Sequence, residues 1–155
     1  MKIEEAEMER HEATIKREQI ASKIGNSDEE DEVERELEKA KLDESDKKIK
    51  VSEYLLEQAE FEPTNLEKAI QNMKEAVEEK YNTIERWINL CVKANKIGGL
   101  DFFLRKESEK LELLVENQSD LKDLNLTIKK LQQKASELQL NVSKEKEKKY
   151  FFVYG

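Results

Sequence analysis

Residues 121–142 read LKDLNLTIKKLQQKASELQLNV, and apolar side chains recur in this stretch at alternating steps of three and four residues. These positions are Leu121, Leu124, Ile128, Leu131, Ala135, Leu138 and Val142. The spacing is typical of a coiled-coil seam, the face that one helix packs against another. The sequence therefore predicts that this stretch is helical and that a second helix covers it.

The composition extends the helical prediction to the whole chain of 155 residues. Charged residues make up 41% of the chain and apolar residues 37%, a mixture that is typical of long helices. The chain has four glycines and one proline, far fewer than the turns of a β-sandwich or a doubly wound sheet require. We therefore expect an all-α protein, an elongated helical bundle or coiled coil with a C-terminal antiparallel α-hairpin.

The first half of the chain predicts two charged helices. The first covers residues 1–24, but Arg10 and Arg17 interrupt its apolar row, so it is marginal unless a partner packs against it. Gly25 is expected to end it. The second helix is expected over residues 28–60, with a capping box from Ser27, and we favour a helix that is continuous through its change of apolar face.

The second half predicts two longer helices. Pro63 ends the second helix, and Thr64 predicts a capping box for a third helix over residues 65–97. Gly98-Gly99 follows, and Asp101 is expected to cap a fourth helix that runs without interruption to about Lys149.

The short connection between these two helices favours an antiparallel hairpin of residues 65–97 against 101–133. The apolar positions of the fourth helix change face near its middle, which indicates one helix that meets two partners in succession. Its overhanging part, around Ala135 to Val142, then requires cover from the second helix or from a second copy of the chain. The expected domains are an acidic helical arm (1–62), the hairpin (63–149) and an aromatic tail (150–155).

The tail reads Tyr150-Phe151-Phe152-Val153-Tyr154-Gly155 and is the densest apolar segment of the chain. Three interpretations remain open. The tail folds back on its own bundle, docks on a protein partner, or lies on a membrane surface beside the preceding lysines.

The sequence holds little material for a catalytic or metal site. There is one histidine, His11, in the most polar helix, and one cysteine, Cys91, on an apolar face where we expect a buried structural thiol. A zinc site requires three or four ligands at set spacing, and a phosphate loop requires glycines after a strand. The consecutive acids of residues 28–32 favour a helix N-terminus over a calcium loop, because no central glycine is present. We expect no enzyme activity and no cofactor or metal.

The charge distribution bears on partners. The net charge is −8, with −6 in residues 1–50, whereas residues 122–149 carry eight lysines against four acids. An acidic chain repels nucleic acid overall, so nucleic-acid binding is disfavoured. The acidic first half and the basic last helix are expected to attract each other, within one chain or between chains. The first residues lack an apolar run, and no stretch has the ~18 apolar residues of a membrane span, so we expect a soluble cytoplasmic protein.

These features favour a non-enzymatic protein that works through association with a protein partner or with itself, as a structural, scaffold or adaptor subunit. The expected contact residues are Leu131, Ala135, Leu138 and Val142 of the seam and Tyr150, Phe151, Phe152 and Tyr154 of the tail. The alternative is an acidic inhibitor whose residues 28–46 imitate the phosphates of nucleic acid and block a basic site.

Overall fold

A computed structural model of the chain describes residues 2–25, 30–59 and 62–154, with side chains described as far as Gln139. Over these ranges the chain forms five α-helices and one 3-10 segment, with no strand, which confirms the all-α prediction. The helices form two compact units, Met1–Asn95 and Lys96–Gly155. The domain boundaries at residues 62 and 149 remain a prediction.

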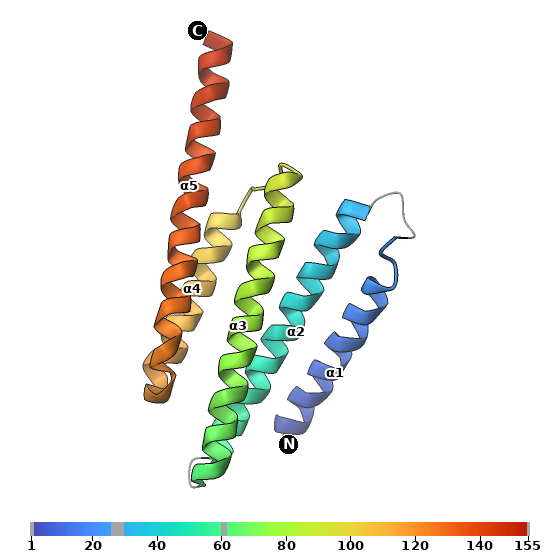
Figure 1. The fold of residues 1–155 in the computed structure, drawn as a ribbon, viewed down its shortest axis with the longest axis vertical. Helices are drawn as coiled ribbons and strands as arrows, with labels where there is room; N and C mark the ends of the chain where they lie inside the picture. Colours follow the sequence, from blue (N-terminus) through green and yellow to red (C-terminus); the bar gives the residue numbers. More distant parts are fainter. Residues whose placement is uncertain (1, 26–29, 60–61, 155) are drawn as a thin grey trace. The chain divides into compact units, whose positions relative to one another are not determined.

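Unit 1 consists of α1 (Lys2–Ala21), α2 (Glu30–Gln58) and α3 (Pro63–Lys93). The middle helix, α2, packs against both α1 and α3, as Figure 1 shows. It is continuous through residues 43–46, as expected. Gly25 has a φ of 85°, a left-handed conformation that glycine adopts at little cost, so the turn after α1 lies where the sequence predicts it.

The expected capping residues are not those that begin the helices. Ser27 lies outside the described residues. The capping residue of α3 is Glu62, which is extended at φ −126° and ψ 105°, so Thr64 lies within the first turn and its predicted capping role is wrong. The reason is Pro63, which suits the first helical position because it lacks the N–H that would be unsatisfied there. For α4 the capping residue is Gly99 (φ 81°), so Asp101 lies in the first turn instead.

Small side chains line the contact between α2 and α3. They recur in steps of seven, at Ser45 and Ser52 on α2, at Ala59 directly after it, and at Ala69, Ala76 and Thr83 on α3, and all six are buried. The buried hydroxyl groups donate to carbonyl oxygens of their own helices; that of Ser52, for example, lies 2.9 Å from the carbonyl oxygen of Lys48. Small residues allow two helices to approach closely, and Met73 and Ile84 fill the adjoining space. Water is therefore excluded from this interface at these positions.

Unit 2 corrects the expectation of one uninterrupted helix from Asp101 to Lys149. The chain forms α4 (Leu100–Asn117), a 3-10 segment η2 (Ser119–Leu124) and α5 (Asn125–Tyr154). The helix ends because Gln118 is extended, with φ −130° and ψ 98°. Asparagine, serine and aspartate surround it in the run Asn117–Asp120, and such residues favour turns over helix interiors. The change of apolar face that the sequence shows near the middle of this stretch arises because the chain reverses direction there, between α4 and α5.

The two helices of unit 2 form an antiparallel hairpin. Arg105 donates a hydrogen bond to Gln139, and Gln132 donates one to Glu112, so residues seven apart on α4 pair with residues seven apart on α5 in reverse order. The predicted seam is buried at Leu121, Leu124, Ile128, Leu131, Ala135 and Leu138, and the side chain of its last member, Val142, lies outside the described residues. The hairpin of residues 65–97 against 101–133 is not confirmed. Its place is taken by α4 against α5.

Leu131→Ala is expected to lower the free energy of unfolding by about 2–5 kcal/mol, because the truncation leaves a cavity in a packed interface. Leu131 is 1% exposed. Urea denaturation of the full chain, followed by far-UV circular dichroism, measures the change, and Leu138→Ala should act in the same direction.

Leu126→Ala is the matched control, because Leu126 lies on the same helix and is 62% exposed. It should change the stability by less than about 0.5 kcal/mol. Equal denaturation curves for Leu131→Ala and Leu126→Ala would contradict the burial of this seam in the α4–α5 hairpin.

Candidate functional site

The C-terminal end of α5 is the first candidate region. Continuing the pairing of Arg105 with Gln139 by one heptad places residue 98 opposite residue 146. Because α4 begins at Leu100, which this register places opposite residue 144, residues 147–154 of α5 extend beyond α4. Figure 1 shows this projecting end of α5 past the start of α4. We call residues 147–154 the α5 end.

The expected contact residues fall into two groups. Leu131, Ala135 and Leu138 are 1%, 3% and 6% exposed, and the hairpin brings them together in the interface with α4, so they already have an intrachain partner. The side chains of the second group lie outside the described residues: Val142, Tyr150, Phe151, Phe152 and Tyr154. The backbone of residues 150–154 continues α5 as helix.

A network of charged side chains across unit 1 is the second candidate region. Arg17 of α1 lies 2.5 Å from the Glu44 carboxylate of α2, which is also 3.4 Å from the ammonium group of Lys48. Lys48 in turn lies 3.0 Å from Glu79 of α3. Ion pairs therefore connect all three helices in the order Arg17, Glu44, Lys48 and Glu79.

Further ion pairs join the helices of unit 1 two at a time. Glu9 of α1 is 3.2 Å from Lys50 and 3.7 Å from Lys47 of α2. Between α2 and α3, Lys80 lies 2.6 Å from Asp46, and Arg86 lies 3.2 Å from Glu38. The Lys80 side chain is only 6% exposed, so this pair lies at the edge of the packed core. Ion pairs thus cross both interfaces of α2, with α1 and with α3.

The sequence contained one signal for this network that its interpretation missed. Arg17 falls in the apolar row of the first helix, where the sequence alone indicates only an interruption that weakens this row. A cation at a position that faces another helix requires an anion there, and α2 supplies Glu44, whose side chain is 8% exposed. The acidic composition of α2 concealed this partner, because any of its many carboxylates satisfies the same requirement.

The environment of Glu44 shifts its pKa. Burial raises the pKa of this carboxyl, but the hydrogen bond from Arg17 and the charges of Arg17 and Lys48 together lower it by more, so the pKa lies below its ordinary value of 4.5. The hydrogen bond to Glu44 raises the pKa of Arg17 in the same way. Both ions are therefore favoured at neutral pH.

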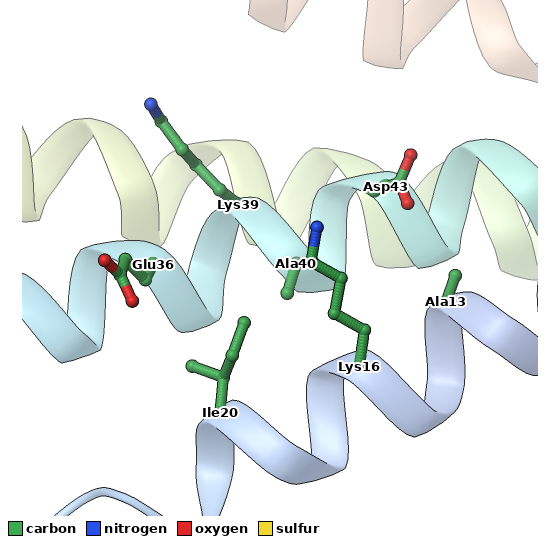
Figure 2. A pocket seen from close by; sticks show the side chains of 7 residues that line it. All are labelled: Ala13, Lys16, Ile20, Glu36, Lys39, Ala40 and Asp43. Carbon is green, nitrogen blue, oxygen red and sulfur yellow. The ribbon is translucent and has the colours of Figure 1, made fainter.

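A surface groove lies between α1 and α2 beside this network, and Figure 2 shows the seven residues that line it. They are Ala13, Lys16 and Ile20 from α1 and Glu36, Lys39, Ala40 and Asp43 from α2. Lys39 extends away from α1, and its ammonium group lies 5.7 Å from the centre of the Trp87 ring on α3. The volume of the groove is about 270 Å³, below the usual range of ligand pockets. Its lining provides ammonium and carboxylate groups but no imidazole, thiol or hydroxyl group.

The two residues singled out for reactive side chains lie apart from each other in the fold. Cys91 is 5% exposed in α3, which confirms the expected burial of its thiol. His11 lies on the exposed side of α1, near Glu7 and Glu12. Among the residues that the structure describes, no three His, Cys, Asp or Glu side chains are grouped so that they could hold a metal ion.

Comparison of the chain with models of protein families, with curated proteins and with solved structures finds no match. Within the described ranges, none of the helices combines the length and the apolar character that crossing a membrane requires. The geometry of the two candidate regions is therefore the basis for the functional proposal.

Acidification is expected to weaken unit 1 through Glu44. Because its pKa is lower in the folded chain than in the unfolded chain, Glu44 stabilises the fold fully at neutral pH. This stabilisation declines as the pH falls below about 4.5 and continues to decline through the lower pKa of the folded state. Urea midpoints at pH 7 and pH 3.5 measure the loss.

Glu44→Gln should lower the free energy of unfolding at pH 7 by about 1–3 kcal/mol, since Arg17 and Lys48 lose their charged acceptor. It should then lose less further stability than wild type between pH 7 and pH 3.5. Glu36→Gln is the control, because this exposed glutamate on the same helix carries the same charge. An unchanged pH dependence in Glu44→Gln would show that the Arg17–Glu44 pair does not stabilise unit 1.

Proposed function

We propose that this chain is a non-enzymatic coiled-coil protein that acts by associating with another protein, as a structural, scaffold or adaptor subunit in the cytoplasm. The observation that carries the proposal is the extension of α5 beyond α4. In the register of the hairpin, the α5 end has no α4 residue opposite it. Its last five residues, 150–154, are aromatic or valine, and a helical turn that is apolar on every side requires packing against another surface.

The sequence of the α5 end supports contact with protein. Residues 150–154 read YFFVY, and five consecutive residues make up more than one turn of an α-helix, so aromatic or valine residues occupy every position of this turn. Aromatic side chains bury large areas and supply much of the binding energy at protein interfaces. An apolar turn of this kind at the end of a charged helix is suited to insertion between other helices.

Residues 144–149, which join the covered seam to the aromatic turn, read KEKEKK. The alternation of sign along this segment suits ion pairing with a second helix that carries both charges. A second copy of this chain is the first partner to test, because its α5 end offers the same mixed charges and the same aromatic turn.

The alternative, an acidic inhibitor that imitates nucleic acid through residues 28–46, has less support. Three of the carboxylates in this stretch are paired with cations of the same chain, at 3.2 Å for Glu38, 2.5 Å for Glu44 and 2.6 Å for Asp46. A carboxylate whose charge is balanced within the fold presents a weaker field to a basic partner. The exposed acids near the start of α2, such as Glu30 and Asp31, remain available for that role.

Replacement of Tyr150, Phe151, Phe152 and Tyr154 with serine is expected to reduce the solution mass of the full chain. Wild type should have the mass of a dimer or a higher oligomer, and the variant should have the mass of a single chain, because the apolar contact surface is lost. Size-exclusion chromatography with light scattering, over a range of concentrations, measures both.

Two controls accompany this variant. Phe102→Ser removes an aromatic residue that is 65% exposed on α4 and should leave the mass of the wild type unchanged. Neutralising Glu30, Asp31 and Glu32 should also leave it unchanged, whereas loss of association in that variant would favour the acidic face. A monomeric wild type, or a serine variant with the wild-type mass, would rule out self-association through the α5 end.

A further inference from the structure

The helix α1 buries little apolar surface. Within it, Ala6 and Ala13 are the buried residues, while Met8 and Ile15 are 64% and 40% exposed. An alanine contributes a single methyl group, so the hydrophobic stabilisation of α1 on α2 is small. By contrast, α3 buries Met73, Val77, Ile84 and Ile88 in addition to its small residues. Apolar burial therefore contributes less to the α1–α2 contact than to the α2–α3 contact, whereas ion pairs occur at both.

Ion pairs add to the stabilisation of α1 on α2, where apolar burial is small. Arg17 contacts Glu44 near one end of α1, and Glu9 contacts Lys50 and Lys47 nearer the other end. Of these side chains, only that of Glu44 is largely buried, at 8% exposure, whereas Glu9 and Lys50 are 42% and 44% exposed. Dissolved salt screens exposed pairs strongly, since the screening length falls from about 10 Å at 0.1 M salt to about 3 Å at 1 M.

Several ion pairs of unit 1 do not involve α1 and would remain if α1 separated from α2. If α1 separates, Glu44 keeps Lys48 at 3.4 Å as a cationic partner, and Lys48 keeps Glu79 of α3. The pairs Lys80–Asp46 and Arg86–Glu38 join α2 to α3 directly and do not involve α1. Glu44 therefore keeps one cationic partner on α2, and the two direct ion pairs between α2 and α3 are independent of α1.

We propose that α1 is a detachable arm: ion pairs hold it on α2, and it separates as a unit when those pairs are weakened, while the α2–α3 pair remains folded. Separation exposes the edge of α2 that α1 covers. The part of α2 that faces α1 includes the buried Ala40 and Glu44 and, farther along, Lys47 and Lys50, so it changes from acidic to basic along its length. The arm is thus a conformational device built into unit 1, controlled by ionic strength, and it does not rest on the association proposed for the α5 end.

Amide hydrogen exchange of the full chain, read by mass spectrometry at constant pH 7, tests the proposal. Peptides from α1 and α3 are compared at 20 mM and 500 mM sodium chloride. The protection of α1 amides should fall by about tenfold or more at the higher salt concentration, because the ion pairs are screened. The protection of α3 amides should not change.

Two neighbouring substitutions separate the ion pair from the general charge of the helix. Arg17→Gln should lower the protection of α1 at 20 mM salt to near its high-salt value and should reduce its salt dependence. Lys16→Gln is the matched control, because it removes the same charge from an adjacent, exposed position that lines the groove, and it should behave as wild type. Glu9→Gln tests the second set of pairs without altering a buried group.

The salt comparison on the unmodified chain remains decisive even if a variant does not fold. Loss of protection in α1 and α3 together at high salt would overturn the proposal, because α1 would then belong to one cooperative unit with the α2–α3 pair. Protection of α1 that responds neither to salt nor to Arg17→Gln would also overturn it, since apolar packing would then hold the arm.

Discussion

Each helix of this chain carries a narrow apolar face, and an isolated helix of mixed charge gains too little from its backbone to remain folded in water. Every helix therefore requires a neighbour that covers that face. In unit 2 this requirement explains the turn at Gln118. Folding α5 back onto α4 buries the row from Leu121 to Leu138 within one chain, which a straight helix cannot do.

The same requirement is met in two different ways on the two sides of α2. Toward α3, small residues repeat every seven positions, the helices pack closely, and large side chains such as Met73 and Ile84 are excluded from water. Toward α1, the fully buried residues of that helix are two alanines, and ion pairs join the two helices. Apolar packing is insensitive to salt at moderate concentration, whereas charge pairs at a surface are screened. A single central helix thus has one neighbour with many buried apolar residues and one neighbour whose buried residues are two alanines.

The functional proposal rests on the part of α5 that extends beyond α4. The seam residues expected to meet a partner, Leu131, Ala135 and Leu138, are used by the hairpin itself. The last turns of α5 extend beyond α4, and their sequence is aromatic. Long helices that end in an apolar turn are suited to assembly, because binding energy at interfaces concentrates in a few buried aromatic residues.

The sequence by itself determined the helical class, the seam from Leu121 to Leu138, the continuity of α2 and the burial of Cys91, because each depends on the spacing of residues close together in the chain. Only the tertiary structure decided where the chain reverses and which charges pair. The run Asn117–Asp120 favours a turn weakly, and the turn becomes favourable through the contact that it creates between α4 and α5. Arg17 and Glu44 lie 27 residues apart, and no local periodicity selects one carboxylate among the many on α2. That choice requires the two helices to be aligned, and their alignment is a property of the folded chain.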